Sequence, residues 1–385
     1  MQFWIDGKSY NPQETDVLEK VFREVDYLQP VIAFTRFWFS TETTWFAKTS
    51  GSTSEPKNIS IERRKIEISA RQSLDYFQLK SPETGLVLCL SANHVGGFMV
   101  LARAFVGDLD VWILPPSSNP MGADGLPAFR KWFISMVPLQ FYTMLSRQSS
   151  VVQSFGWKGI LLGGADLSET ETVRMKLLGC PVFHSYGMTE TVSHIAVRQI
   201  FPTLNSTLNT IPFEVFPGVK IRTNPDSCLE INAQVTDNKW ITTMDHVEIF
   251  SSTQFLFLGR ADFMINSGGV KIDPVQVKQL LTSILTSYTL SFEILGLPDS
   301  RFGEKVVVVF FEADENVFKE FWNTVFWEMS LAKIKDENQR RFLPSSVFYL
   351  PEKPLTASQK VDYPRLRKII SDQNPVWDKW KDHQT

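Results

Sequence analysis

The sequence predicts an α/β fold: a large N-terminal domain with parallel-rich sheets and a β subdomain, followed by a small α+β C-terminal domain. The first observation is the alternation, from about Thr43 to Phe183, of short apolar runs with longer segments of helical character, which is typical of a mostly parallel sheet. The second is a change of texture at Gly218–Leu258, where short β-like runs are separated by turn residues. The third is the mixed helix and strand pattern that follows Arg260.

The N-terminal domain contains short apolar runs that we expect to be strands. These runs are Trp45–Lys48, Leu86–Leu90, Val111–Leu114, Gly159–Leu162 and Val182–His184. Two intervening segments are expected to be helices. Glu62–Phe77 carries apolar residues at helical spacing, and Gly97–Val106 is nearly all apolar.

The C-terminal domain is expected to begin at the boundary Gly259–Asp262, which divides the chain into residues 1–259 and 260–385. A glycine-rich hairpin is expected around Ser267–Gly269, and a helix at Pro274–Ile284. The remaining expected elements are strands at Phe292–Leu295 and Val306–Phe311 and an aromatic helix at Phe318–Met329.

Composition excludes several classes of protein. The 385 residues include 39 basic and 42 acidic ones, a formal charge of −3, so no electrostatic footprint for a nucleic acid is present. The 3 cysteines are far apart and lack CxxC spacing, which favours reduced thiols in the cytoplasm over disulfides or a zinc site. No signal peptide is visible at the N-terminus. The uncharged stretch Thr84–Ala102 has a polar centre, so we expect no membrane span.

The segment Thr49–Lys57, TSGSTSEPK, is the most informative one. Hydroxyls and backbone N–H groups of such a loop can surround phosphate oxygens, and Lys57 adds a positive charge. The alternative is an ordinary polar surface turn. It is not a Walker A loop, because no GKS or GKT closes it.

The segment His184–Glu190, HSYGMTE, follows an apolar run. Ligands bind at the carboxyl ends of strands in parallel sheets. There Tyr186 can stack on a base, Thr189 can bind a phosphate oxygen, and Glu190 is a suitable oxygen ligand for Mg²⁺. A plain strand-to-helix turn is the alternative.

Two further segments follow. In Gly259–Lys271, GRADFMINSGGVK, Gly268 and Gly269 permit positive φ, and Arg260 or Asp262 can act as a hinge; the alternative is a simple hairpin. Pro354–Lys360, PLTASQK, is a polar segment that ends in a single lysine. Lys360 is a candidate functional residue, and the alternative is an ordinary solvated lysine.

Taken in order, these motifs resemble the adenylate-forming superfamily, which includes acyl-CoA synthetases. They are TSGSTSEPK, GGA at Gly163–Ala165, YGMTE, an isolated Asp245, GRADFMINSGGVKI and PLTASQK, and the resemblance extends from Thr43 to Arg367. It implies ATP, Mg²⁺ and CoA as the small molecules bound, and a mobile C-terminal domain that acts as a lid.

The resemblance also implies a role for each matching residue. Thr49, Ser50, Gly51, Ser52, Thr53 and Lys57 belong to the phosphate loop, and Gly163, Gly164 and Ala165 to the adenine-side turn. Tyr186 stacks on adenine, Thr189 contacts the α-phosphate, and Glu190 binds Mg²⁺. Asp245 and Arg260 hold the ribose, Lys360 reaches the carboxylate and α-phosphate, Asp262 is the hinge, and Gly268 and Gly269 face CoA. Ser54, Met244 and Gln359 depart from the family pattern, but none of these departures removes a charged group.

The short chain resembles the compact ligases of menaquinone synthesis that activate o-succinylbenzoate. The run His94–Arg103, HVGGFMVLAR, carries an arginine at the end of an apolar helix, which is costly unless it meets an anion. We expect Arg103 to hold the second carboxylate of that acid, and His94, Ser193 and His194 to line the acid pocket. Alternatively, Arg103 reaches the surface or pairs with Asp108 or Asp110, and His94 is an ordinary core histidine.

Three functions remain open on sequence alone. The first is an o-succinylbenzoate–CoA ligase. The second is another aryl or acyl acid ligase, or an adenylation enzyme that loads a carrier protein. The third is a non-catalytic adenylate-binding protein, against which the retention of Lys57, Glu190, Asp245, Arg260 and Lys360 argues. The sequence leaves the oligomeric state open.

Overall fold

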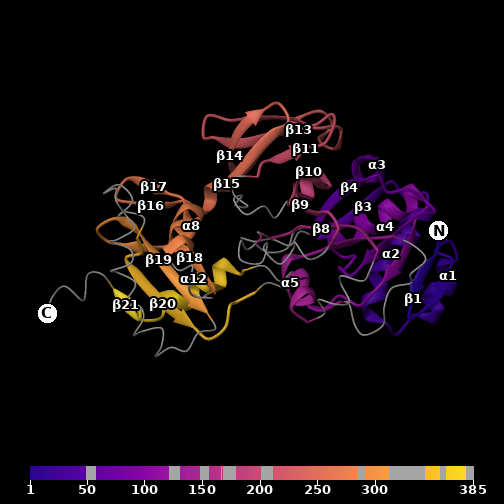
Figure 1. Cartoon of the computed structure of the whole chain (residues 1–385), viewed down its shortest axis with the longest axis horizontal. Helices are drawn as coiled ribbons and strands as arrows, with labels where there is room; N and C mark the ends of the chain where they lie inside the picture. The colour runs from indigo at the N-terminus through magenta and orange to yellow at the C-terminus, as the bar shows by residue number, and fades with distance from the viewer. Residues whose placement is uncertain are drawn as a thin grey trace. The chain divides into compact units, whose positions relative to one another are not determined.

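The computed structural model describes residues 1–48, 58–120, 131–147, 156–165, 167, 179–200, 211–284, 291–311, 343–355 and 361–378. The chain divides into two compact units (Figure 1). The first unit comprises Met1–Pro225, Leu229–Thr243 and Glu248–Phe257, and the second comprises Asp226–Cys228, Met244–Val247 and Leu258–Thr385.

The first unit begins with β1 (Phe3–Ile5), β2 (Lys8–Tyr10), α1 (Thr15–Val21), the 3-10 turn η1 (Asp26–Leu28) and α2 (Gln29–Phe39). It continues with β3 (Thr44–Lys48), β4 (Asn58–Glu62), α3 (Arg63–Phe77), β5 (Thr84–Leu88), α4 (Val95–Gly107), β6 (Asp110–Ile113), β7 (Lys131–Met136), α5 (Pro138–Arg147) and β8 (Trp157–Leu162). Then follow β9 (Val182–Met188), the 3-10 turn η3 (Thr189–Thr191), β10 (Ser193–Gln199) and β11 (Phe213–Val215).

The centre of the first unit is a parallel sheet, as the sequence predicts. Strands β9, β8, β7, β5, β6 and β1 lie side by side, each parallel to its neighbour. Strands β2, β10 and β11 extend this sheet with antiparallel pairs. All residues of β5 and β6 are buried, as expected of parallel strands that are covered on both faces.

Alternate residues of β7 contact different helices. The Phe133 ring lies 4.9 Å from that of Phe77 in α3, measured between ring centroids. Its neighbour Ile134 belongs to a core cluster that contains Phe141 and Met144 of α5. Because successive side chains of a strand point to opposite faces, α3 and α5 cover opposite faces of this sheet.

The predicted strand Trp45–Lys48 is a strand, but the expectation that it belongs to the parallel sheet is wrong. It forms β3, which pairs antiparallel with β4 in a separate two-stranded sheet. The physical reason is local. Two strands that follow one another closely in the chain can pair antiparallel, whereas a parallel pair needs a longer crossover.

The pair β9–β10 carries an irregularity. Its register shifts between His194 and Ala196, where β10 has one extra residue opposite β9. On the β9 side, a Cβ added to Gly187 would lie 2.1 Å from the backbone oxygen of Ser193, so only glycine fits there. Strand β9 also runs on to Met188, well beyond the predicted end at His184.

The β-like runs after Gly218 are confirmed as strands. They are β12 (Lys220–Thr223), β13 (Cys228–Asn232), β14 (Trp240–Ser251) and β15 (Gln254–Arg260), with the 3-10 turn η5 (Gln234–Thr236) after β13. The strand order of the large sheet is β12-β13-β14-β15-β11-β10-β9-β8-β7-β5-β6-β1-β2. Strands β12–β15 therefore extend the large sheet beyond β11.

The second unit contains the 3-10 turn η6 (Ala261–Phe263), β16 (Ile265–Ser267), β17 (Val270–Ile272), α8 (Pro274–Ile284), β18 (Ser291–Asp299), β19 (Gly303–Phe311), β20 (Ser346–Leu350), α12 (Tyr363–Ser371) and β21 (Trp377–Asp378). The predicted hairpin is β16–β17, and the predicted helix 274–284 is α8 with the same bounds. The expected helix at Phe318–Met329 lies outside the described residues.

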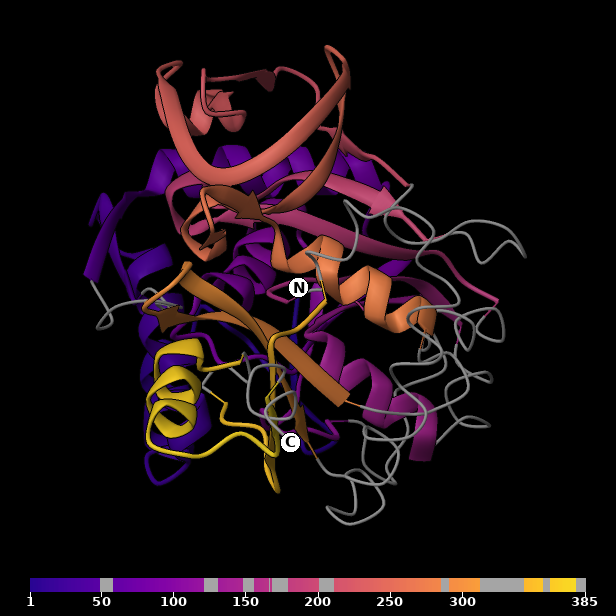
Figure 2. The same cartoon turned by 90° about the vertical axis from the view of Figure 1, so that its left-hand side faces the viewer.

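Helices α8 and α12 cover opposite faces of the β18–β19 pair (Figure 2). Val277 and Leu281 of α8 share a core cluster with Ile294. Leu366 of α12 shares another with Leu295. The alternation along β18 therefore gives each helix its own half of the core.

Helix α4 is strongly apolar, and it lies in the core of the first unit. Its residues Gly97–Ala104 are all buried. Within the described ranges, no helix combines the length and the apolar character needed to cross a bilayer. Burial of α4 between α2, α3 and the sheet accounts for its composition.

Candidate active site

The predicted adenine-side turn, Gly163–Ala165, lies directly after β8. Its first residue donates its backbone N–H to the backbone oxygen of Met136 at 3.2 Å. A Cβ at Gly163 would lie 2.5 Å from the Ser185 hydroxyl oxygen, so β9 passes very close to this turn. The imidazole of His184 lies 3.1 Å, through Nε2, from the backbone oxygen of Ala165.

The tautomer of His184 follows from its second partner. Arg198 of β10 donates from Nε to His184 Nδ1 at 3.2 Å. A guanidinium only donates, so Nδ1 accepts and Nε2 carries the proton that it gives to Ala165. Burial lowers the pKa of His184, and the charge of Arg198 lowers it further, to about 3. A neutral histidine therefore fixes the turn against β9 at physiological pH.

Tyr186, Thr189 and Glu190 lie at the end of β9 and in the turn η3 that follows. The Tyr186 ring contacts Phe255 edge to face, with centroids 5.1 Å apart, and lies 5.7 Å from Phe213. Tyr186 belongs to the strand itself, whereas Thr189 and Glu190 begin the turn. The structure thus brings Tyr186, the adjoining turn residues and the Gly163–Ala165 turn to one end of the parallel sheet.

Glu190 is exposed. In the described part of the chain it joins no group of three or more His, Cys, Asp or Glu side chains that could enclose a metal ion. One exposed carboxylate is compatible with Mg²⁺, which usually keeps several waters and phosphate oxygens as ligands. Glu190 therefore fits a metal site that it shares with a nucleotide.

Arg103 is buried, with 2% of its surface exposed. Its Nη2 donates to the hydroxyl of Ser135 on β7 at 3.1 Å, and its Nε has no hydrogen-bond partner among the described residues. Asp108 and Asp110, the sequence-based alternatives, lie against the N-terminal amine at 3.2 and 3.9 Å. No carboxylate of the described ranges forms an ion pair with Arg103, and burial lowers its pKa to about 10.

His194 lies in a chain of hydrogen bonds between β10 and α3. Its Nε2 is 2.8 Å from the Ser73 hydroxyl, which donates to the backbone oxygen of Ser69 at 3.1 Å. Nε2 is therefore the donor to Ser73, and Nδ1 accepts from the Ser193 hydroxyl at 3.1 Å. Burial, followed by the charge of Arg103, lowers the pKa of His194 to about 3, so Arg103 and a neutral His194 share one interior region.

Two local features accompany this region. Ser193 and the preceding Val192 have φ values of +92° and +53°, a left-handed backbone that non-glycine residues seldom adopt and that often marks functional positions. His94 lies at the start of α4, and its buried Nδ1 has no hydrogen-bond partner in the described residues. Of the two histidines of the predicted acid pocket, His94 is half-buried and His194 is buried.

A separate group lies in the second unit. The carboxylate of Asp245 is 3.7 Å from Nη1 of Arg260, so the two predicted ribose contacts are brought together. The hinge candidate Asp262 lies in η6, and Gly268 and Gly269 form the turn between β16 and β17 with φ values of +58° and +80°. These positive φ values match the expected role of the two glycines in a tight turn.

Some predicted site residues lie outside the described residues. They are Thr49, Ser50, Gly51, Ser52, Thr53 and Lys57 of the phosphate loop, and Lys360. Their roles remain predictions. Conversely, sequence reasoning gave no role to His184, Arg198, Ser135 or Ser73. Of these residues, only His184 belonged to a segment that the sequence singled out, and its pairing with Arg198 across β9 and β10 became visible only in the fold.

Residues 45–222 match the family model described as "AMP-binding enzyme". We refer to these residues, somewhat less than half of the chain, as the AMP-binding domain after the model that they match. It contains the parallel strands β5, β6, β7, β8 and β9, but not β1, together with the Gly163–Ala165 turn. The predicted acid-pocket residues lie within the AMP-binding domain as well.

Known proteins are similar to this chain over most of its length. A relative from Enterococcus faecalis, "2-succinylbenzoate–CoA ligase", is 22% identical over 339 residues, and the match covers 81% of this chain and 67% of the relative. The crystal structure of an "acyl-CoA synthetase (AMP-forming)/AMP-acid ligase II-like protein" from Dyadobacter fermentans is 27% identical, with a TM-score of 0.57, and the match covers 90% of this chain and 95% of that one.

A further structural match concerns the fold. The "O-succinylbenzoate Coenzyme A Synthetase (MenE)" from Bacillus subtilis, in complex with ATP and magnesium ion, has a TM-score of 0.66 and 20% identity. The match covers 84% of this chain and 69% of that one. Over the matched part, this chain therefore shares its fold with that protein.

His194 generates a prediction about acid stability. Its pKa is about 3 in the folded protein against an ordinary 6.5, so below pH 6.5 the unfolded chain takes up a proton that the folded one refuses. The His194 contribution to stability is thus complete above pH 6.5 and falls as the pH drops. In His194→Asn, the loss of unfolding free energy between pH 6.5 and 5.0, measured by urea titration, should shrink by about 2 kcal/mol.

Ser73→Ala is the matched control for this measurement. It removes the Nε2 partner but keeps the imidazole, so it should lower stability and keep the pH dependence. Full pH dependence in His194→Asn would contradict the assignment of a neutral, buried imidazole.

Proposed function

We propose that this protein is an ATP-dependent acid–CoA ligase that activates o-succinylbenzoate as an acyl-adenylate, releases pyrophosphate and then forms the CoA thioester, a step of menaquinone biosynthesis. The observation that carries the choice of acid is the buried Arg103, whose hydrogen-bond partner among the described residues is the Ser135 hydroxyl. The AMP-binding domain supports the activation of a carboxylate by ATP.

The environment of Arg103 favours an anionic acid. A guanidinium has five N–H donors, and burying one without a matching anion costs several kcal/mol. His194 cannot supply a countercharge, because an imidazole is either neutral or cationic, and with a pKa of about 3 it stays neutral beside Arg103. A bound acid with a second carboxylate would supply the missing anion, and o-succinylbenzoate has two carboxylates, of which only the succinyl one is activated.

The chemistry of the first step needs charge stabilisation. The succinyl carboxylate attacks the α-phosphorus of ATP, pyrophosphate leaves, and negative charge grows on the α-phosphoryl oxygens. In the proposal Lys360 and the Thr189 hydroxyl bind those oxygens, the phosphate loop with Lys57 binds the outer phosphates, and Tyr186 orients the base. Glu190 would hold Mg²⁺, which neutralises phosphate charge when it is bound.

In the second step the acyl group is transferred from AMP to CoA. The thiol of CoA attacks the acyl carbonyl of the adenylate, and AMP leaves with its electron pair. Lys360 has no role in that attack, so its domain can turn about Asp262 and present Gly268 and Gly269 to CoA. The two half-reactions therefore depend on different residues, which makes them separable by mutation.

The direct test of the function is a panel of acids. Pyrophosphate release should require o-succinylbenzoate and should be at least about 30-fold slower with a fatty acid of similar size, since a charge that loses its buried partner typically costs about 2 kcal/mol or more. A thioester should form only when CoA is added. Faster turnover of fatty acids would favour another acyl ligase, a requirement for a carrier protein would favour a loading enzyme, and no release with any acid would favour a non-catalytic binder.

The role of Arg103 is tested with an acid that lacks the ring carboxylate. Arg103→Met should raise KM for o-succinylbenzoate about 100-fold, and it should barely change KM for 4-oxo-4-phenylbutanoate, which has no ring carboxylate. The matched control Ser135→Ala keeps the cation and should have a smaller effect. An equal rise of KM for both acids would place Arg103 outside the pocket.

The role of Lys360 is tested on the separate half-reactions. Lys360→Ala should slow adenylation by a few orders of magnitude, because it removes a charge that stabilises the transition state. Thioester formation from preformed acyl-adenylate should remain nearly unchanged. Equal loss of both half-reactions would contradict the assigned role.

A further inference from the structure

Glu293 of β18 is a buried carboxylate in the second unit, with 5% of its surface exposed. Oε1 accepts from Nζ of Lys353 at 3.1 Å. Oε2 accepts from Nζ of Lys278 at 2.9 Å and from the hydroxyl of Tyr363 at 3.0 Å. Burial alone raises the pKa of Glu293, but the two lysines outweigh it and lower the pKa to about 2, so the group is ionised at physiological pH.

Two of these partners lie on either side of the segment that carries Lys360. Lys353 precedes that segment, and Tyr363 follows it as the first residue of α12. The ends of the segment are also joined through the backbone: Leu355 and Val361 form a β-bridge, and Asp362 donates its N–H to the oxygen of Pro354 at 2.9 Å. Glu293 thus binds residues on both sides of segment 356–360, and we call Lys353 and Tyr363 the stems of the loop that carries Lys360.

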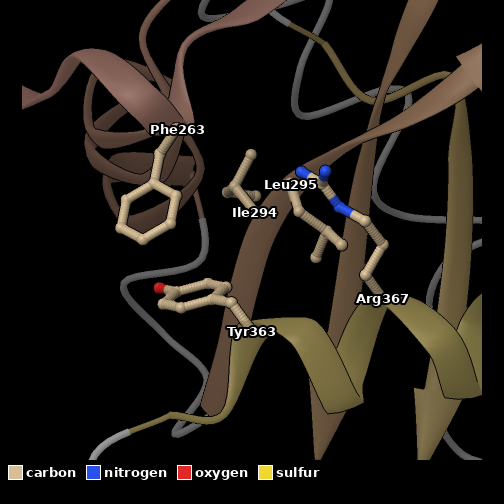
Figure 3. Close-up of a pocket in the computed structure, with 5 residues that line it drawn as sticks. All are labelled: Phe263, Ile294, Leu295, Tyr363 and Arg367. Carbon is tan, nitrogen blue, oxygen red and sulfur yellow. The ribbon is translucent and has the colours of Figure 1, made fainter. Parts of the chain in front are cut away.

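Tyr363 extends this connection to the hinge segment. Its ring lies 4.9 Å from that of Phe263, which ends the turn η6 that contains Asp262. Figure 3 shows the two rings facing each other, with Arg367 one helical turn further along α12 and Ile294 and Leu295 beside them. The cavity between these five side chains is about 40 Å³, room for a water molecule or two and too small for a nucleotide.

Stability alone is a weak reason for such a cluster. A buried ion pair often stabilises a fold no better than well-packed apolar residues would, and its better-supported role is to select one arrangement of the chain. Here the arrangement selected is that of Lys353 and Tyr363, because Glu293 shares a strand face with Leu295, which α12 covers. The carboxylate and its three donors are mutually satisfied, so the cluster has no need of a ligand.

We propose that Glu293 is a positioning residue for adenylation: by holding Lys353 and Tyr363, it fixes both stems of the loop that carries Lys360. The inference rests on the proposed function for the role of Lys360. A lysine that must meet the α-phosphate needs a defined loop, since a misplacement of about 1 Å can cost 100-fold in rate. Glu293 itself touches no substrate.

The test compares Glu293→Gln and Tyr363→Phe with the control Lys278→Met. Lys278 binds the same carboxylate from α8, but it is not a stem of the loop. Both test variants should slow adenylation of o-succinylbenzoate at least 10-fold and leave thioester formation from preformed acyl-adenylate within 2-fold. The control should leave both half-reactions within about 2-fold. Tyr363→Phe removes one oxygen atom and serves alone where Glu293→Gln fails to fold.

Hydrogen exchange gives a second readout that needs no activity. The amide of Asp362 reports on the loop, because it donates to Pro354. In Glu293→Gln this amide should exchange at least about 10-fold faster, with the amides of β19 unchanged.

The outcomes separate the two proposals. Equal slowing of both half-reactions, equal slowing in Lys278→Met, or unchanged adenylation would overturn the role of Glu293. Absence of adenylation in the wild-type protein with every acid would refute the proposed function, and the Asp362 amide would then decide whether Glu293 holds the loop.

Discussion

The guanidinium of Arg103 and the carboxylate of Glu293 are both removed from water, and the way each is compensated shapes its unit. A buried charge is tolerated only when hydrogen bonds and opposite charges replace its hydration. Glu293 has this compensation within the protein, from two lysines and a tyrosine. Arg103 has one hydroxyl among the described residues. The first arrangement suits a structural clamp, and the second suits a site whose anion arrives with a ligand.

Two neutral histidines of the sheet, His184 in β9 and His194 in β10, lie near buried arginines. His184 and His194 each accept at Nδ1 and donate at Nε2, so each imidazole has a defined tautomer. Both are neutral because burial and a neighbouring arginine disfavour the imidazolium. Arg198 thus has a directed acceptor, and Arg103 has a neighbour that does not repel it. In the described part of the AMP-binding domain, Arg103 and Arg198 are buried arginines, and each lies near a neutral histidine.

Sequence patterns predicted the elements with local signals. Helix α8 was found with its observed bounds, because a proline begins it and apolar residues recur at helical spacing. The β16–β17 turn was found from two adjacent glycines. The pairing of β3 was misjudged, since an apolar run does not state whether its partner is parallel or antiparallel. The motifs named candidate site residues, but a motif gives no distance between side chains that are far apart in the chain.

Contacts between side chains that are far apart in the chain could not be predicted from the sequence. Glu293 meets Lys353 and Tyr363 across 60 and 70 positions, and His194 meets Ser73 across 121. Each of these residues alone is an ordinary polar side chain of a strand or helix. Only the fold brings them together, so their chemistry has no motif that a single sequence could display.

The extra residue of β10 near Ile195 has a consequence for how one strand is used. Side chains alternate along a strand, so an insertion of one residue exchanges the sides that all later positions serve. His194 is paired with Gly187, and Arg198 is paired with His184. Gly187 and His184 are three positions apart in β9, so they lie on opposite sides of that strand. His194 and Arg198 therefore face away from each other, although their even spacing would have aligned them in a regular strand. A single irregularity lets one strand furnish two chemically distinct neighbourhoods.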